Sequence, residues 1–310
     1  MFYQIVNTLN PISLDEYNEN ILTLGLISLE EFSTCYNQFG FSKETIIECQ
    51  SSTRQKHGLI GTYDTYHFGI ISGIETKHFI QLKDRIGIFI KANLFLIVII
   101  EDADSSINKD LESSLKQINF KTVSLERLVF GFLERFIYNN YAILEDMESE
   151  LGKHEDRIDQ NQLNKNFNFE ITGIRKRLLL LDNYYEQLII IGEELEDNSI
   201  DIFHEANLRY FKLFTDRANR LSENTRMLNE YCTHVREAYN AQLDYNLNNI
   251  MKIFTVVTTI FLPLTLIVGW YGMNLKMPEF SWDYGYLFVI LLCISVVILC
   301  ILYFKKKKFL

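Results

Sequence analysis

Two uncharged apolar runs stand out in the last sixty residues of the chain. The first covers residues 253–268 and the second covers residues 285–304. An α-helix rises about 1.5 Å per residue, so a run of about 20 residues can cross the roughly 30 Å hydrocarbon core of a bilayer. The pattern predicts a transmembrane helix over 253–273, an outer loop over 274–284 and a second transmembrane helix over 285–304.

Residues 1–122 mix strand and helix signals. Runs of β-branched and aromatic residues predict strands, and segments that follow Ser13 or Ser28 with an acid close behind predict helices. The expected strands are 2–6, 66–74, 79–82, 85–90, 94–100 and 121–123, and the expected helices are 15–22, 28–36 and 104–117. This alternation predicts a layered α/β domain.

From Ser124 onward the pattern changes to long helices. Residues 125–159 and 171–197 have apolar positions at helical spacing and predict a helical hairpin with a polar turn between its arms. Neither Pro nor Gly occurs from Ser199 to Pro263, which predicts a helix of about 95 Å. The expected domains are therefore a cytoplasmic α/β domain with the hairpin (1–198), a stalk helix (199–252) that continues into the first span, and a basic tail (305–310).

The predicted hairpin carries many carboxylates on both arms. A solvated helix face explains them as well as a regulatory metal site does. If they bind metal, the candidate ligands are Glu145, Asp146, Glu148, Glu193 and Glu194.

A stripe with steps of three and four residues runs along the predicted stalk and first span, on one face of the helix. Its members are Gly269, Thr265, Leu262, Thr258, Thr255, Met251, Asn248, Asp244, Ala241 and Glu237, and the opposite side holds Ile253, Val257, Ile260, Leu264 and Val268. Polar groups in a span face protein or water, so the stripe lines a pore or forms a helix–helix seam. Its continuation into Asn248, Asp244 and Glu237 favours the pore, because a packing seam has no need of carboxylates.

The charge of the chain is unevenly divided. The chain has 30 basic and 40 acidic residues, and six of the basic and two of the acidic ones lie beyond residue 250. Residues 1–250 therefore hold 24 basic and 38 acidic residues and carry a net charge of −14. That balance disfavours a nucleic-acid partner, and beside a pore it would concentrate cations. Lys252 precedes the first run and Lys305–Lys308 follow the second, so both termini are expected in the cytoplasm. The first residues lack the basic start of a signal peptide.

The outer end of the first span carries the most specific motif. Tyr271-Gly272-Met273-Asn274 is followed by Met277-Pro278-Glu279, and with the run Phe261-Leu262-Pro263-Leu264-Thr265 it resembles the signature of the CorA family of magnesium and cobalt transporters. The resemblance implies a funnel-shaped homopentamer in the inner membrane, with five first spans around an axial pore.

The resemblance also implies roles for single residues. Asn274 would form the selectivity ring with Gly272 and Met273, and Glu279 would attract cations at the outer loop. The pore-lining positions of the family fall on Thr265, Leu262, Met251 and Asn248, and its acidic inner ring falls on Glu237. Leu262 stands where the family often has Met. Phe254 replaces a smaller aliphatic residue at the hydrophobic constriction, where it would tighten the gate.

These features together predict a channel-like transporter of hydrated Mg²⁺, and of Co²⁺ or Ni²⁺, into the cytoplasm. The sequence has no phosphate-binding glycine motif and no paired histidines, so we expect no nucleotide and no enzymatic activity. The membrane potential would drive entry, and internal Mg²⁺ that bridges the acidic domains would close the gate. Two alternatives remain open: a zinc or other transition-metal transporter of the same architecture, and a membrane-anchored metal sensor or scaffold.

Overall fold

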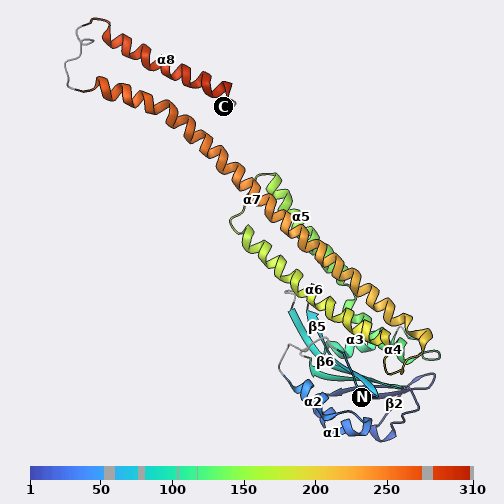
Figure 1. Cartoon of the computed structure of the whole chain (residues 1–310). Helices are drawn as coiled ribbons and strands as arrows, with labels where there is room; N and C mark the ends of the chain where they lie inside the picture. Colours follow the sequence, from blue (N-terminus) through green and yellow to red (C-terminus); the bar gives the residue numbers. More distant parts are fainter. Residues whose placement is uncertain (52–59, 76–80, 103–104, 117, 274–281, 308–310) are drawn as a thin grey trace. The chain divides into compact units, whose positions relative to one another are not determined.

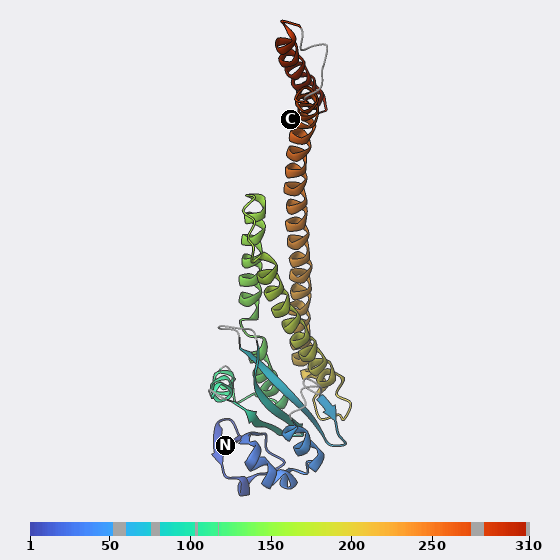
Figure 2. The ribbon, with the colours of Figure 1, turned by 90° about the vertical axis from the view of Figure 1, so that its left-hand side faces the viewer.

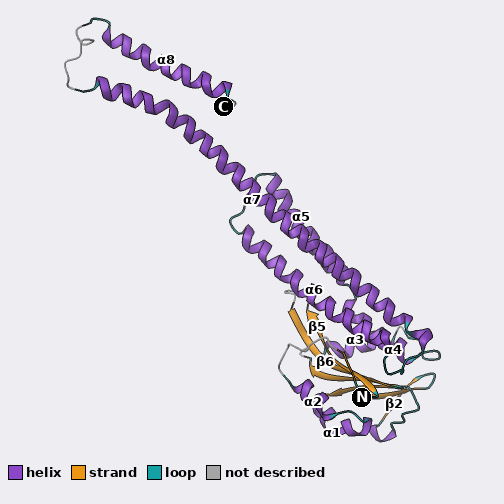
Figure 3. Cartoon of the chain, viewed as in Figure 1, coloured by secondary structure: helices purple, strands orange, loops and turns teal. Residues whose placement is uncertain are grey.

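The structure is a computed structural model of residues 1–310 that describes all of them except 52–59, 76–80, 103–104, 117, 274–281 and 308–310. Its internal contacts divide the chain into two units. The first comprises Met1–Asp156 and Asn164–Val235, and the second comprises Arg157–Leu163 and Arg236–Leu310. Among the described residues, strands occur only up to Glu101, and the chain after it is helical or loop (Figure 3).

A seven-stranded sheet forms the base of the first unit. Its strand order is β2-β1-β3-β7-β6-β5-β4, and only the β3–β7 pair is parallel. The strands are β1 (Phe2–Ile5), β2 (Leu9–Ile12), β3 (Thr23–Ser28), β4 (Ile60–Thr62), β5 (Tyr66–Glu75), β6 (Gln81–Lys91) and β7 (Leu94–Glu101). The expected strands at 2–6, 66–74 and 94–100 are confirmed. The two expected over 79–90 are one strand, β6, with an irregular register between Arg85 and Ile86.

Helices cover both faces of this sheet (Figure 1). Helices α1 (Leu29–Cys35) and α2 (Lys43–Gln50) lie on one face, with α3 (Ser106–Leu115) and α4 (Leu125–Ile137) on the other. The middle of strand β7 is buried, and its successive side chains point to opposite faces of the sheet. Leu96 packs in the aromatic cluster on the side of α1, whereas the ring centroid of Phe95 lies 5.7 Å from that of Phe132 of α4. The predicted α/β layers are therefore confirmed.

Two short segments differ from the expectations. Residues 15–22 are not a helix: only a 3₁₀ turn, η1 (Leu14–Glu16), forms before β3 joins the sheet. Residues 121–123 are not a strand, because the Asn119 side chain accepts a hydrogen bond from Lys121 N and its carbonyl accepts one from Thr122 N, which closes a turn. A 3₁₀ turn, η2 (Tyr36–Phe39), follows α1.

The expected single helix over 125–159 is broken into α4 and α5 (Asn140–Asp159). Tyr138 is extended and Asn139 has φ 65°, a left-handed conformation that asparagine tolerates. The carbonyl of Phe136, freed at the end of α4, accepts hydrogen bonds from Asn140 Nδ2 (3.1 Å) and from the Tyr184 hydroxyl (2.9 Å). The partners that stabilise the break thus come from α5 and from a distant helix.

Three long helices pack side by side above the sheet in the first unit (Figure 2). They are α5, α6 (Phe167–Asp197) and the first part of α7 (Arg209–Tyr271). Ion pairs join α5 to α6 (Glu150–Arg177, 2.6 Å) and α6 to α7 (Glu186–Arg226, 2.6 Å). The second arm of the predicted hairpin is confirmed as α6, whereas the first arm is α5 alone, because the break at residues 138–139 separates it from α4.

The stalk helix starts later than expected, at Arg209 instead of Ser199. Residues 199–208 form a loop that ends in a 3₁₀ turn, η4 (Glu205–Asn207). Asn198 is left-handed, and its side chain both donates to the carbonyl and accepts from the amide of Phe203. Phe203 is buried against Phe211, so burial of an aromatic ring closes the loop.

Two glycines of α6 provide a matched test of the α6–α7 packing. A Cβ at Gly192 would lie 2.3 Å from Thr215 Oγ1 and 3.1 Å from Phe214, whereas a Cβ at Gly173 would meet nothing within 4 Å. Gly192→Ala should therefore lower the stability by about 1–3 kcal/mol through overpacking. Gly173→Ala should raise it by about 0.5–1 kcal/mol because alanine favours the helix. Thermal unfolding followed by circular dichroism measures both, and equal effects would contradict the close approach.

Two helices in the described part of the chain are long and apolar enough to cross a membrane. They are the end of α7 and all of α8 (Gly285–Lys306), and their most apolar windows are 0% and 6% buried within the single chain. A segment this apolar and this exposed needs lipid or other chains around it. The two predicted spans are thus present as helices.

Candidate pore-lining face of α7

Helix α8 covers one face of the apolar part of α7. The residues of α7 that are half-buried recur at steps of three and four, and they are Val256, Ile260, Pro263, Leu264 and Ile267. On the same stretch, Cys300 Sγ of α8 lies 3.8 Å from the carbonyl oxygen of Thr259. Helix α7 stays continuous through Pro263, which lies on this covered side.

The predicted stripe lies on the opposite face of α7 and is uncovered along its whole length in the single chain. Every member is exposed, from Glu237 through Gly269. The large apolar members are among the most exposed residues of the helix, with Met251 at 62% and Leu262 at 65%, and Phe254 beside the stripe is 63% exposed. The structure therefore places all the sequence-predicted stripe residues together on one exposed face.

The side opposite the stripe is only partly as expected. Ile260 and Leu264 are half-buried under α8, but Ile253, Val257 and Val268 remain exposed. The reason is geometric, since one neighbouring helix covers only a narrow strip of another. The exposed aliphatic residues form the flanks of α7, where lipid or further helices can contact them.

Threonine hydroxyls on α7 donate to the carbonyl oxygens four residues earlier. The Thr255 hydroxyl donates to Met251, that of Thr258 to Phe254 and that of Thr265 to Phe261, each at 2.8 Å. This bond is the usual one for threonine within an apolar helix, and it uses the only hydrogen of the hydroxyl. The oxygen lone pairs then remain available, so these three threonines present acceptors to the stripe.

A shallow groove of about 820 Å³ follows the upper part of the stripe. Its lining residues are Val257, Thr258, Phe261, Leu262, Thr265, Leu266, Gly269, Trp270 and Met273. A Cβ placed on Gly269 would meet no atom within 4 Å, so the groove stays open at its outer end.

Gly272 follows the last residue of α7, Tyr271, at a point where the backbone approaches itself closely. Its amide donates to the carbonyl of Val268 at 2.8 Å, and a Cβ on Gly272 would lie only 2.9 Å from the same oxygen. Glycine is therefore required for this tight end, and Met273 follows it, half-exposed. Asn274 and Glu279, the predicted filter and outer-loop residues, lie outside the described residues.

At the inner end, the hairpin loop contacts the side of α7 away from the stripe. Gln242 Nε2 and Asn246 Nδ2 both donate to Asn161 Oδ1, at 3.1 and 2.9 Å. These contacts leave Asp244 and Asn248 of the stripe exposed. The predicted inner mouth, Asp244 and Glu237, and the predicted pore-lining Asn248 thus lie on the exposed face.

The five carboxylates suggested as regulatory ligands do not form one site in a single chain. Glu145 and Glu148 line a hollow of about 410 Å³ between α5 and α7, together with Met227 and Tyr231. Glu193 and Glu194 are near the far end of α6, outside that hollow. Among the described residues, no group of three or more His, Cys, Asp or Glu is placed to hold a metal ion.

One buried carboxylate was missed by the sequence reasoning. Glu126, 1% exposed in the first turn of α4, accepts a hydrogen bond from the His204 amide (2.7 Å) and one from the Asn207 side chain (3.1 Å). It therefore ties α4 to the loop that precedes α7. A signal was present, because Glu126 falls at helical spacing with the apolar Val129, Phe130 and Leu133.

Comparison with known proteins decides the family. The model of the family described as "CorA-like Mg2+ transporter protein" matches residues 28–306. The chain belongs to this family. The resemblance inferred from the motif at Gly272 is confirmed.

Curated CorA proteins match parts of the chain. The magnesium transport protein CorA of Helicobacter pylori (strain ATCC 700392 / 26695) is 36% identical over 132 residues, which are 42% of this chain and 41% of that protein. The cobalt/magnesium transport protein CorA of Thermotoga maritima is 23% identical over 184 residues, 59% of this chain and 52% of that protein. The chain thus spans about two fifths to one half of the length of these relatives.

Solved structures match the whole fold. The complete structure of the CorA magnesium transporter from Methanocaldococcus jannaschii has a TM-score of 0.80 at 20% identity, and the match covers 100% of this chain and 98% of that one. The full-length CmaX protein has a TM-score of 0.75 at 14% identity, and the match covers 99% of this chain and 96% of that one. The CorA architecture is therefore shared from end to end: an α/β domain, a long helix and two apolar helices.

Proposed function

We propose that this CorA family member is a channel-like transporter that carries hydrated Mg²⁺, and also Co²⁺ and Ni²⁺, through a membrane into the cytoplasm. The observation that carries the proposal is the uncovered stripe on α7, which presents threonine oxygens between apolar residues while α8 covers the opposite face. Five copies of α7 around an axis, with α8 outside, would bury each stripe in a water-filled pore of the inner membrane, with both termini in the cytoplasm.

The hydroxyl groups of the stripe suit a hydrated cation because they are free to act as hydrogen-bond acceptors. Mg²⁺ releases its waters reluctantly, and the hydrogens of those waters point outward. Thr258 and Thr265, whose own hydrogens are used within the helix, can accept from these waters without stripping them. Met251 and Phe254 would form an apolar constriction that closes by dewetting. Asn274, in a ring of five carboxamides, would select the hydrated ion at the outer end.

The membrane potential supplies enough energy for entry. A divalent ion that crosses about 100 mV gains about 4.6 kcal/mol, twice the roughly 2.3 kcal/mol of one elementary charge. That energy supports roughly thousandfold accumulation, because each 1.4 kcal/mol is a factor of ten. The proposed transport thus needs no nucleotide.

Uptake combined with cysteine accessibility tests the proposal. In liposomes that hold a Mg²⁺ dye and an inside-negative potential, the protein should carry Mg²⁺. In a background in which Cys293 and Cys300 are serine, a methanethiosulfonate reagent should block Thr258→Cys on the stripe and spare Ile260→Cys under α8. Absence of any flux would favour a sensor or scaffold, and stronger flux of Zn²⁺ than of Mg²⁺ would favour a transition-metal transporter.

Regulation by internal Mg²⁺ is part of the proposal. The charge of −14 before residue 251 would repel neighbouring copies unless cations neutralise it. Glu145, Asp146 and Glu148 are exposed and belong to no group of metal ligands within the described part of one chain, so in this proposal the ion lies between two copies and draws carboxylates from both. Limited proteolysis should therefore be slower in millimolar Mg²⁺ than in EDTA. Equal cleavage rates would remove the support for this gate.

A further inference from the structure

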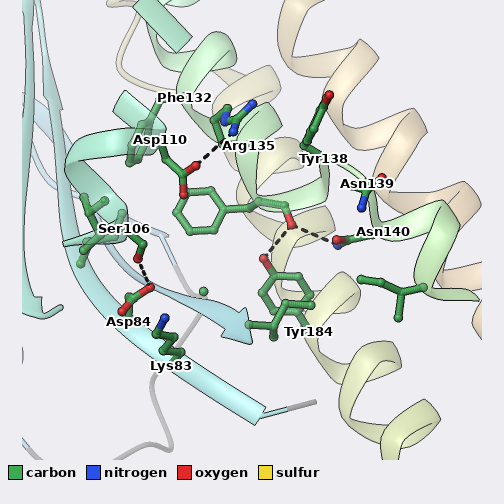
Figure 4. A pocket seen from close by; sticks show the side chains of 16 residues that line it. Lys83, Asp84, Ser106, Asp110, Phe132, Arg135, Tyr138, Asn139, Asn140 and Tyr184 are labelled. Atoms are coloured by element: carbon green, nitrogen blue, oxygen red, sulfur yellow. Dashed lines mark hydrogen bonds and ion pairs between the residues drawn. The ribbon is translucent and has the colours of Figure 1, made fainter. Parts of the chain in front are cut away.

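A polar cavity of about 290 Å³ lies in the first unit, between the sheet and the helices that cover it (Figure 4). Its wall comes from β5 and β6, from α3 and α4, from the α4–α5 break and the first turn of α5, and from Tyr184 of α6. This volume is close to the lower end of the range for small-molecule sites. Part of the wall is apolar, formed by Ile86, Ile107, Phe132, Phe136 and Ile143.

Four charged side chains line the cavity, two of each sign. Lys83 and Asp84 lie on β6, where Asp84 Oδ2 accepts a hydrogen bond from the Ser106 hydroxyl at 2.6 Å. Arg135 of α4 pairs with Asp110 of α3 at 3.1 Å. Figure 4 shows these two groups at different places on the wall. The cavity therefore offers a carboxylate and a cation at separate points and has no net charge.

The guanidinium of Arg135 has a donor that is not satisfied. Its Nε is buried and has no hydrogen-bond partner in the described part of the chain, while Nη2 bonds to Asp110. The ring of Tyr138 lies 4.8 Å from the guanidinium carbon and restricts its position. A buried donor without a partner is unfavourable, and a ligand carboxylate that accepts from Nε would satisfy it.

The composition of the wall argues against other ligand classes. A divalent cation would face Lys83 and Arg135, and no group of three metal ligands occurs among the described residues. A phosphate dianion would add two negative charges and no positive charge to a wall whose own charges already cancel, whereas a zwitterion adds no net charge. A purely apolar molecule would desolvate all four charges without replacing their contacts with water.

We propose that this cavity binds a neutral α-amino acid with a branched or aromatic side chain. The ligand carboxylate bonds to Arg135, its ammonium lies against Asp84, and its side chain packs on Phe132 and Phe136. Tyr138 and Asn139 at the α4–α5 break line the same cavity. A bound ligand therefore links the sheet to this break and stabilises the folded first unit by mass action.

Matched ligands test the proposal on the full-length protein in detergent. L-leucine and L-phenylalanine are compared with 3-methylbutylamine, which lacks the carboxylate of leucine, and with 4-methylpentanoate, which lacks its ammonium. Binding is measured by saturation-transfer NMR and by thermal shift. At least one amino acid should bind saturably, and each truncated analogue should bind at least about tenfold more weakly, a difference of about 1.4 kcal/mol.

Two variants separate the ends of the ligand. Arg135→Gln should weaken binding of the amino acid at least tenfold and leave binding of 3-methylbutylamine unchanged. Asp84→Asn should weaken binding of the amino acid at least tenfold and leave binding of 4-methylpentanoate unchanged. Arg175→Gln, an exposed residue of α6 away from the cavity, is the control and should change nothing. If Arg135→Gln does not fold, by circular dichroism, Asp84→Asn carries the test. No binding by either amino acid, equal binding of an analogue, or tighter binding of Mg²⁺ or inorganic phosphate at the cavity overturns the proposal.

Discussion

Asn274→Ala should reduce Mg²⁺ uptake at least a hundredfold. In the proposed pentamer this substitution removes five carboxamides at once from the outer ring. Hydrated Mg²⁺ would then meet no oriented acceptors at the pore entrance, and conduction depends on a site that is favourable enough to enter. The measurement is the initial rate of dye response in liposomes, at equal amounts of reconstituted protein.

Asn249→Ala is the matched control for this substitution. Asn249 is half-buried on α7, off the exposed stripe, so the same chemical change there should leave uptake within about twofold. Asn248→Ala, one residue away but on the stripe, should have an intermediate effect. Equal losses at positions 249 and 274 would mean that folding or assembly, and not the filter, is affected. Normal uptake by Asn274→Ala would contradict the proposed filter.

Glu126→Ala should destabilise the first unit by about 2–3 kcal/mol. The His204 amide and the Asn207 side chain would lose their acceptor, and each unsatisfied buried donor costs about 1–3 kcal/mol. For a domain of this size the apparent melting temperature should fall by about 4–12 °C, since about 1 kcal/mol corresponds to roughly 2–4 °C. Thermal unfolding by circular dichroism in detergent measures the change.

Glu205→Ala serves as the control for the loss of a carboxylate at the same junction. Glu205 is exposed in the turn that contains Asn207, so its removal should change stability by less than about 0.5 kcal/mol. Glu126→Gln keeps one acceptor oxygen and should fall between the two. If Glu126→Ala has the same melting temperature as the unchanged protein, the loop before α7 does not depend on this carboxylate.

The local pattern determined much of the fold. Helix capping was predictable where both partners are close in the sequence. The Ser28 side chain accepts a hydrogen bond from Glu31 N, and the Glu31 side chain accepts one from Ser28 N. Helix α1 therefore begins where the sequence predicted. The apolar runs specified α8 and the end of α7 for the same reason, since length and hydropathy are local properties. The three-and-four spacing of the stripe likewise follows from helix geometry alone.

Distant partners decided the features that the sequence reasoning missed. The break at Asn139 depends on Tyr184 of α6, and the late start of α7 depends on burial of Phe203 against Phe211. The burial of Glu126 depends on two hydrogen-bond donors that lie 78 and 81 residues away in the sequence. The cavity at Arg135 is likewise assembled from several separate segments of the chain.

The sequence by itself thus determined the two long apolar helices, the motif at Gly272 and which residues share a face of α7. Only the tertiary structure decided which face α8 covers, where the long helices break and which charges meet at Arg135. The physical reason is the distance along the sequence over which each interaction acts. Periodicity and capping depend on neighbours within about one helical turn, whereas burial and hydrogen bonding between distant segments are set by how the whole chain packs.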